Sequence, residues 1–245
     1  MFRIFSGRLD VPAVTYLTDL SVHRLWVHEG VDLHLALHPL PAAEAVRLGA
    51  GTTRVVQPVV PARFVEARDK GQARLLARRA LGLPDGPRLA LVAGGSLGIG
   101  ELECAAVDIA ATGLVVPVVL CGRNDRLRHR LGRYPGVIAL DWVEDMRTVY
   151  AAVDVVVQNA GGFTSLESRA MGVPTVTYRC IAGHGERNAA ALDQAGWAPW
   201  FRTPDELAAG LVKVLTGSPV LRSADEDPVD VVDAIFPSRV ALATA

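Results

Sequence analysis

Strand-length apolar runs alternate with helix-length amphipathic segments along most of this 245-residue chain. Several runs, such as residues 89–93 and 155–157, consist of valine, leucine and alanine, which is typical of strands that helices cover on both faces. Parallel strands need helical connections between them. The pattern therefore predicts an α/β fold built on a doubly wound parallel sheet.

The expected elements follow one another closely. The expected strands are 14–18, 33–37, 54–60, 89–93, 117–121, 137–141, 154–158 and 175–178. The expected helices are 42–48, 70–83, 100–112, 125–131, 146–153, 164–171, 186–195 and 204–215. A proline-rich stretch over 57–64 indicates a linker. We therefore expect an N-terminal domain over 1–62, a fuller domain over 63–217, and an exposed acidic tail over 218–245.

Composition narrows the possible functions. The 25 basic and 26 acidic side chains give a net charge of −1, which argues against a nucleic-acid-binding protein. No apolar run approaches the ~18 residues of a membrane span. The three cysteines form neither a disulfide framework nor a zinc motif, so we expect a protein of the reducing cytoplasm. The spacing of histidines, cysteines and carboxylates indicates no other metal site. The sequence does not indicate an oligomeric state.

A first glycine-rich segment, residues 94–100, directly follows an expected strand and precedes an expected helix. Glycine lets a ligand approach the backbone closely, and a helix N-terminus attracts an anion such as a diphosphate. The same residues also fit the G-x-S-x-G nucleophile elbow of α/β-hydrolases, with Ser96 as nucleophile and Asp141 or Asp154 followed by His184. Both interpretations stay open at this point.

A second glycine turn, with Gly161 and Gly162, again connects a strand to a helix. Both turns should lie at the carboxyl edge of the sheet, where open α/β sheets bind their ligands. Glu167 is expected on the first helical turn, where its carboxylate can accept hydrogen bonds from two ribose hydroxyls. The alternative is that Glu167 only complements the dipole of its own helix.

A third segment, residues 181–189, also lies between a strand and a helix and is dense in hydrogen-bonding groups. His184, Glu186 and Asn188 suit the recognition of sugar hydroxyls.

A fourth segment, residues 18–28, follows a strand and combines titratable groups with a tryptophan. Alone it is a weak signal. His34 and His38 nearby are interpreted as surface residues.

Together these four segments resemble the monogalactosyldiacylglycerol synthases and processive diacylglycerol glycosyltransferases, and more distantly the lipid-linked N-acetylglucosaminyltransferase of peptidoglycan synthesis. The resemblance covers about residues 12–215 and is most specific over 18–28, 121–124, 141–146 and 159–167. It implies a GT-B-like fold with one complete Rossmann-like C-terminal domain and a partial N-terminal one, the remnant of an acceptor-side domain.

The resemblance also implies an activity, the transfer of a hexose from a UDP-sugar to a lipid acceptor resembling diacylglycerol. The UDP-sugar would be a co-substrate, with no further cofactor. The protein would be cytoplasmic, with peripheral contact at the inner face of the plasma membrane. Because the chain starts after the family's glycine-rich acceptor loop, a non-catalytic or truncated UDP-sugar-binding module that needs a missing half stays open, as does the hydrolase.

Site residues are carried over by motif. The resemblance implies that Gly95, Ser96, Gly161, Gly162, Phe163 and Thr164 face phosphate, Val143 and Met146 the nucleoside, Glu167 the ribose, and His184, Glu186 and Asn188 the donor sugar. It places Asp19 and His23 on the acceptor side, where they are weak candidates for the general base. Where the family has an arginine after a Pro-Val pair, this chain offers Arg63 instead.

Overall fold

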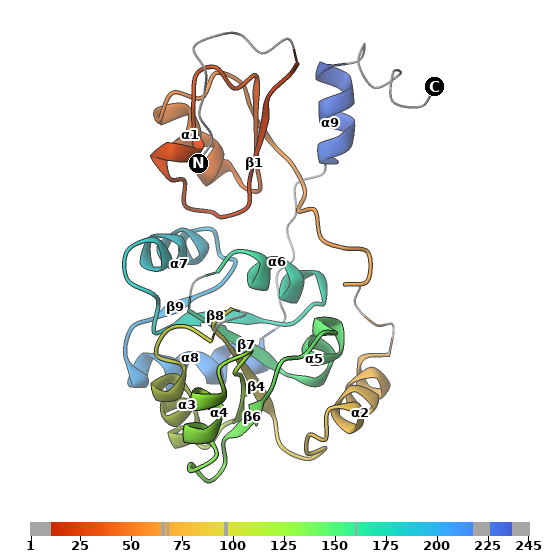
Figure 1. The fold of residues 1–245 in the computed structure, drawn as a ribbon, viewed down its shortest axis with the longest axis vertical. Coiled ribbons are helices and arrows are strands. Elements are labelled where there is room, and N and C mark those ends of the chain that lie inside the picture. Colours follow the sequence, from red (N-terminus) through yellow and green to blue (C-terminus); the bar gives the residue numbers. More distant parts are fainter. Residues whose placement is uncertain are drawn as a thin grey trace. The chain divides into compact units, whose positions relative to one another are not determined.

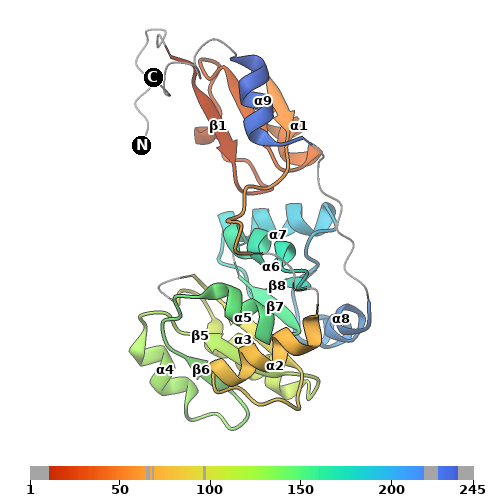
Figure 2. The ribbon, with the colours of Figure 1, turned by 90° about the vertical axis from the view of Figure 1, so that its right-hand side faces the viewer.

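The computed structural model describes residues 11–64, 67, 69–95, 98–159, 161–217 and 226–236. The chain forms two compact units, shown in Figures 1 and 2. Unit 1 comprises Met1–Val59 together with Arg222–Ala245, and unit 2 comprises Val60–Leu221. Among the described residues, no helix has both the length and the apolar character needed to cross a bilayer.

Unit 1 contains a three-stranded parallel sheet in the order β1-β2-β3. Its elements are β1 (Val14–Leu17), the 3-10 helix η1 (Arg24–Trp26), β2 (Leu33–Ala36), α1 (Pro39–Arg47) and β3 (Thr53–Val55). On one face of the sheet, Leu17 and Ala36 pack with Ala45 of α1. Burial of this apolar face against the helix stabilises the short strands.

The acidic tail expected over 218–245 is in part a helix. Helix α9 (Pro228–Ile235) begins at Asp227, whose carboxylate accepts a hydrogen bond from the Val229 N–H at 2.8 Å. Three of its apolar side chains, and Phe236 directly after it, pack on the second face of the unit 1 sheet, over Leu33, Leu35 and Val56. Figure 1 shows α9 beside this sheet. The acidic composition predicted solvent exposure, but the spacing of valine and isoleucine gives this helix an apolar face.

Unit 2 contains a six-stranded parallel sheet in the order β6-β5-β4-β7-β8-β9. Its strands are β4 (Leu89–Ala93), β5 (Val116–Leu120), β6 (Ile138–Leu140), β7 (Val155–Gln158), β8 (Thr175–Tyr178) and β9 (Trp200–Phe201). Its helices are α2 (Lys70–Ala80), α3 (Leu102–Ala111), α4 (Asp125–Leu131), α5 (Met146–Ala152), α6 (Phe163–Ala170), α7 (His184–Gln194) and α8 (Pro204–Thr216). Strand order reverses between β4 and β7, which is the place where doubly wound sheets bind ligands.

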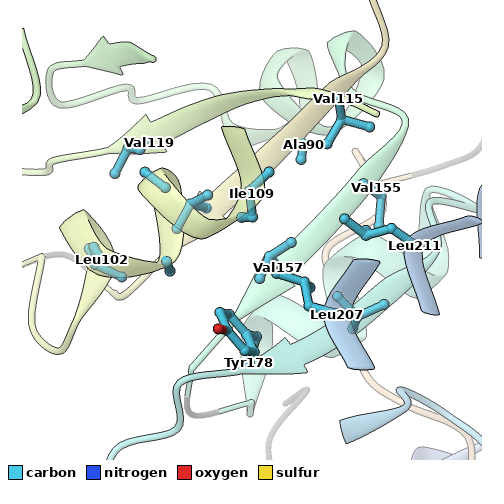
Figure 3. Packing of buried hydrophobic residues seen from close by; sticks show 14 of the residues in the cluster. Ala90, Leu102, Ile109, Val115, Val119, Val155, Val157, Tyr178, Leu207 and Leu211 are labelled. Atoms are coloured by element: carbon cyan, nitrogen blue, oxygen red, sulfur yellow. The ribbon is translucent and has the colours of Figure 1, made fainter. Parts of the chain in front are cut away.

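Both faces of this sheet are covered, as the unbroken apolar strands predicted. On one face, α3, α4 and α8 pack over residues such as Val92, Val119 and Val157. Figure 3 shows Leu102, Ile109, Leu207 and Leu211 closing over these strands. On the other face, α2, α5 and the end of α6 pack over alternate residues of the same strands, such as Leu91 and Val156.

A buried arginine forms hydrogen bonds along the amino edge of the unit 2 sheet. Arg78 of α2 is 3% exposed and donates hydrogen bonds to four backbone carbonyls and to Asp154, which directly precedes β7. Asp154 also accepts from the Leu89 N–H at 2.8 Å. The pair therefore connects α2 with the first residues of β4 and β7.

His34 lies in the core of unit 1, although the sequence analysis placed it on the surface. Its exposed fraction is 0%, and it sits in the central strand β2, level with Thr15 of β1 and Thr53 of β3. Among the described residues, neither ring nitrogen has a hydrogen-bond partner. Burial lowers the pKa of His34, an effect larger than the opposing one from the Thr52 backbone. The ring is therefore neutral near pH 7.

Candidate functional site

The turn after β4 brings backbone to the carboxyl edge of the sheet. Gly95, Gly98 and Gly100 all have positive φ values, of 73°, 57° and 101°. A Cβ on Gly94 would lie 2.6 Å from the carbonyl oxygen of Ile99, so no larger residue fits there. The predicted glycine-rich turn therefore needs its glycines for conformation and for space. Ser96, expected at the phosphate or as a nucleophile, lies outside the described residues.

The turn after β7 lies at the same edge, because β7 and β4 are neighbouring parallel strands. Gly161 and Gly162 have φ values of 88° and 65°, and Gly162 is the N-cap of α6. A Cβ on Gly161 would overlap the side-chain amide of Asn188, which is 1% exposed. Asn188 therefore packs beneath this turn, and its buried side chain offers no surface to a donor sugar.

The third turn follows β8 and leads into α7. Gly183, with a φ of 82°, is the N-cap, and His184 is the first helical residue. The Glu186 carboxylate accepts a hydrogen bond from the Gly183 N–H at 3.3 Å. Of the three residues expected near a donor sugar, Glu186 is exposed and His184 is half-buried, so both can reach a ligand at this edge.

The helices after these turns start differently from their neighbours. Helices α2, α4, α5 and α8 begin at Asp69, Asn124, Asp145 and Thr203, whose side chains accept hydrogen bonds from the first helical turn. Among the residues that the structure describes, the starts of α3 and α6, which follow the first two glycine turns, have no such side-chain cap. Their first N–H groups and positive dipole ends therefore point toward the edge where an anion can bind.

Glu167 is held at this edge by a buried tyrosine. Its Oε2 accepts a hydrogen bond from the Tyr150 hydroxyl at 3.0 Å, and Tyr150 is only 1% exposed. Burial raises the pKa of Glu167, while the Tyr150 hydrogen bond and the charge of Arg63 lower it by less. Helix α6 starts at Phe163, so Glu167 lies on the second helical turn. The expectation that it lies on the first turn is wrong. This position argues against Glu167 serving only as a dipole partner.

The linker residues Arg63 and Phe64 lie near the Glu167 carboxylate and its partner Tyr150. The Phe64 ring packs edge-on against Tyr150, with ring centroids 6.0 Å apart. The Arg63 guanidinium lies 4.9 Å from the Phe64 ring centroid. This stacking keeps a positive charge near Glu167, so Arg63 does lie on the candidate-site side of unit 2. Sequence reasoning did not identify Tyr150, because nothing in the order of residues pairs it with Glu167.

The remaining expected residues lie in the segments that follow β6 and β7. Phe163 is 60% exposed at the start of α6, and Thr164 beside it is half-buried. Val143 and Met146, expected at the nucleoside, lie after β6 and are partly buried against the core. The neighbouring Trp142 is 46% exposed and lies under the Arg123 guanidinium, 4.9 Å from the ring centroid. The segments 121–124 and 141–146 are thereby joined through a cation–π contact.

The geometry contradicts the hydrolase interpretation. Asp154 is at the amino edge of the sheet and is paired with Arg78, about 13 Å along the strand from the turn that contains Ser96. Asp141 follows β6 and His184 follows β8, so four strand spacings of ~4.8 Å, about 19 Å in all, separate them. Within the part of the chain that the structure describes, neither carboxylate is placed to orient His184, which contradicts the Asp–His pairing that the hydrolase interpretation needs.

Asp19 and His23 belong to unit 1, whereas the other candidates belong to unit 2. His23 is the N-cap of η1, and its Nδ1 accepts a hydrogen bond from the Leu25 N–H at 3.2 Å. In the neutral ring the proton then lies on Nε2, so neither nitrogen has a lone pair free to accept a proton. This arrangement weakens the case for His23 as a general base.

A cavity of about 340 Å³ lies elsewhere in unit 2, at the amino edge of the sheet. It is lined by residues that precede β4, β7 and β8, including Arg88, Asp154 and Pro174, and by the carboxyl ends of α5, α6 and α8. Lys70, Arg74 and Arg88 also line this cavity, but no described residue of the three glycine turns reaches it, so it lacks the backbone N–H groups that suit a diphosphate. We therefore place the candidate site at the opposite, glycine-rich edge.

Comparison with known proteins shows which proteins this chain resembles. Residues 103–217 match the family model "Glycosyl transferases group 1". The chain is 24% identical to the processive diacylglycerol beta-glucosyltransferases of Bacillus pumilus (strain SAFR-032) and Bacillus subtilis (strain 168), over 92% of its length in each case. It spans 60% and 58% of the length of these two relatives.

Solved structures share the fold. Anabaena Alr3699/HepE, crystallised in complex with UDP and glucose, matches 96% of this chain with a TM-score of 0.57 and 16% identity, and 72% of its own chain is covered. Acinetobacter baumannii MurG matches 84% of this chain with a TM-score of 0.54 and 17% identity, and 59% of its own chain is covered. By fold the chain is of the GT-B type, and by sequence it is similar to the processive diacylglycerol glucosyltransferases and, over residues 103–217, to the glycosyl transferases of group 1.

Proposed function

We propose that this chain is a glycosyltransferase, or the donor-binding part of one, that takes a hexose from a UDP-sugar. The observation that carries this proposal is the convergence of three glycine turns on one sheet edge, with Glu167 beside them. The N–H groups of the turns and the starts of α3 and α6 suit a diphosphate, and Glu167 suits the ribose. The complex of Alr3699/HepE with UDP and glucose supports the same ligand class.

The chemistry that this edge can supply is stabilisation of a leaving group. Attack of an acceptor hydroxyl on the anomeric carbon breaks the bond from that carbon to the diphosphate oxygen. Positive charge develops on the sugar, and negative charge develops on the departing UDP. Backbone N–H groups already aimed at the diphosphate stabilise this charge without reorganising during the reaction. A general base must also take the proton of the acceptor hydroxyl.

A lipid acceptor resembling diacylglycerol is the finer part of the proposal. Its support is the printed name of the relatives in Bacillus, which act on diacylglycerol. Peripheral contact with the inner face of the plasma membrane is part of the same proposal, because an acceptor resembling diacylglycerol lies in a membrane. We test it by incubating the chain with radiolabelled UDP-glucose or UDP-galactose and diacylglycerol vesicles. Label in the lipid fraction is expected for one donor, and its absence with both donors would contradict transfer to this acceptor.

One observation favours a second function, UDP-sugar binding without transfer. His23, a candidate base, uses its Nδ1 to accept a backbone hydrogen bond. A chain that binds UDP-glucose in calorimetry but transfers no label to diacylglycerol, and releases no free glucose, would have this second function.

A further inference from the structure

A buried amide lies where the three glycine turns meet. Asn159 directly follows β7 and is 4% exposed. Its side-chain Nδ2 donates a hydrogen bond to the carbonyl oxygen of Ile99, in the turn after β4, at 2.8 Å. Its backbone carbonyl accepts a hydrogen bond from the Ile181 N–H, in the turn after β8, at 2.9 Å. One residue therefore connects all three turns.

The fit around this amide is close. A Cβ added to Gly100 would overlap the Asn159 Nδ2, so the glycine leaves the space that the amide fills. The carbonyl of Ile99 needs a donor, which a side-chain amide provides and a carboxylate or an aliphatic side chain does not. Because β4, β7 and β8 are adjacent in the sheet, the central turn is the one from which a single residue can reach both others.

An independent feature holds the third turn on its other side. Arg179, the residue after β8, has a φ of 47° and is the only non-glycine residue with positive φ in the described part of the chain. Its guanidinium pairs with Asp108 at 2.7 Å and with Glu101 at 2.8 Å, both from the segment that forms and precedes α3. Such a backbone conformation persists only where surrounding contacts enforce it. The turn from Arg179 to Gly183 is therefore held in one position.

We propose that Asn159 is a positioning residue that assembles the three turns into one diphosphate-binding surface before any ligand arrives. Asn159 is only 4% exposed, so its side chain offers little surface to a ligand. It acts through the backbone of its neighbours. This inference rests on the proposed function, because the surface is assigned to UDP there. Binding to turns that are already ordered costs less conformational entropy than binding to turns that must first be ordered.

The test compares Asn159→Ala with a matched control, Thr175→Val. The control removes a buried hydroxyl of β8 that is hydrogen-bonded to the Ser168 hydroxyl at 2.6 Å, away from the glycine turns. For each variant, the UDP dissociation constant is measured by calorimetry, the melting temperature by scanning calorimetry, and amide exchange of the turns by mass spectrometry. If the alanine variant does not fold, Asn159→Ser replaces it, because serine is too short to reach Ile99.

Asn159→Ala should weaken UDP binding by about tenfold or more and speed amide exchange in the turns after β4 and β8. Thr175→Val should lower the melting temperature to a similar extent and leave UDP affinity unchanged. Unchanged UDP affinity and unchanged exchange in Asn159→Ala would overturn the inference. If the wild-type chain binds no UDP, the proposed function fails, and exchange in the two turns still decides whether Asn159 assembles them.

Discussion

Replacing His34 with leucine should stabilise unit 1 and remove part of its sensitivity to acid. The imidazole is 0% exposed in the central strand β2, and in the described residues neither ring nitrogen has a hydrogen-bond partner. A buried polar group without a partner costs about 1–3 kcal/mol, and an apolar side chain of similar size avoids this cost. We therefore expect His34→Leu to raise the stability of unit 1 by about 1–3 kcal/mol at pH 7.

The pH dependence follows from the direction of the pKa shift. Burial lowers the pKa of His34 below the 6.5 of a free imidazole, so the unfolded chain binds a proton before the folded chain does as pH falls. The contribution of neutral His34 to the free energy of unfolding is fully present above about pH 6.5. It is lost as pH falls from there through the pKa of His34 in the folded chain. The upper limit of this loss between pH 7 and pH 5.5 is about 1.3 kcal/mol, for a ring that binds no proton in the folded chain over that range.

The assay is amide exchange of the β2 peptide, Leu33–Ala36, measured by mass spectrometry at pH 7 and pH 5.5 with correction for the intrinsic rates. Exchange through opening reports the local free energy of unit 1. The wild type should lose stability at the lower pH, and His34→Leu should lose less, by up to about 1.3 kcal/mol. Equal losses in the two proteins would refute the reasoning, because His34 would then not be buried as a neutral ring.

Three further changes test other contacts. Arg78→Met should destabilise unit 2 by about 2–4 kcal/mol in urea unfolding, because it leaves four backbone carbonyls without their donor, while Asp154 keeps Arg74 and the Leu89 N–H; a loss under 1 kcal/mol would contradict this. Tyr150→Phe should weaken UDP binding several-fold in calorimetry by freeing the Glu167 carboxylate to move, and unchanged affinity would show that the hydroxyl does not position it. Gly161→Ala should abolish UDP binding and lower the melting temperature, because its Cβ would overlap the Asn188 amide; a variant with wild-type binding would mean that the turn can adapt.

Much of the fold could be predicted because its signals are local. Unbroken valine and leucine runs mark the buried strands of unit 2, and residues 89–93 and 175–178 match β4 and β8 at both ends. The two-residue strand β9 was missed, because a strand this short carries no periodicity. Helix α9 was missed because its acidic residues indicate exposure, while its stability comes from packing on distant strands.

The candidate site was predictable where glycine was the signal. The glycines of the first two turns all have positive φ or leave no room for a Cβ. Each therefore predicts its turn from a single position in the sequence. The residues that hold these turns could not be read in this way. Asn159, Tyr150 and Arg179 act through partners that are remote in the sequence or on another element. Likewise, the burial of His34 depends on neighbouring strands and not on its own type.

The central claim is that the glycine-rich edge of unit 2 binds UDP. We would measure it by titrating the intact chain with UDP and with ADP in a calorimeter, and by repeating the titration with Glu167→Gln. The glutamine keeps the size of the side chain and can still accept the Tyr150 hydrogen bond, so a change in affinity reports the loss of the carboxylate. The account predicts micromolar UDP binding that is selective over ADP and weakened by at least about tenfold in the variant. Equal binding of the two nucleotides, or none of either, would contradict it.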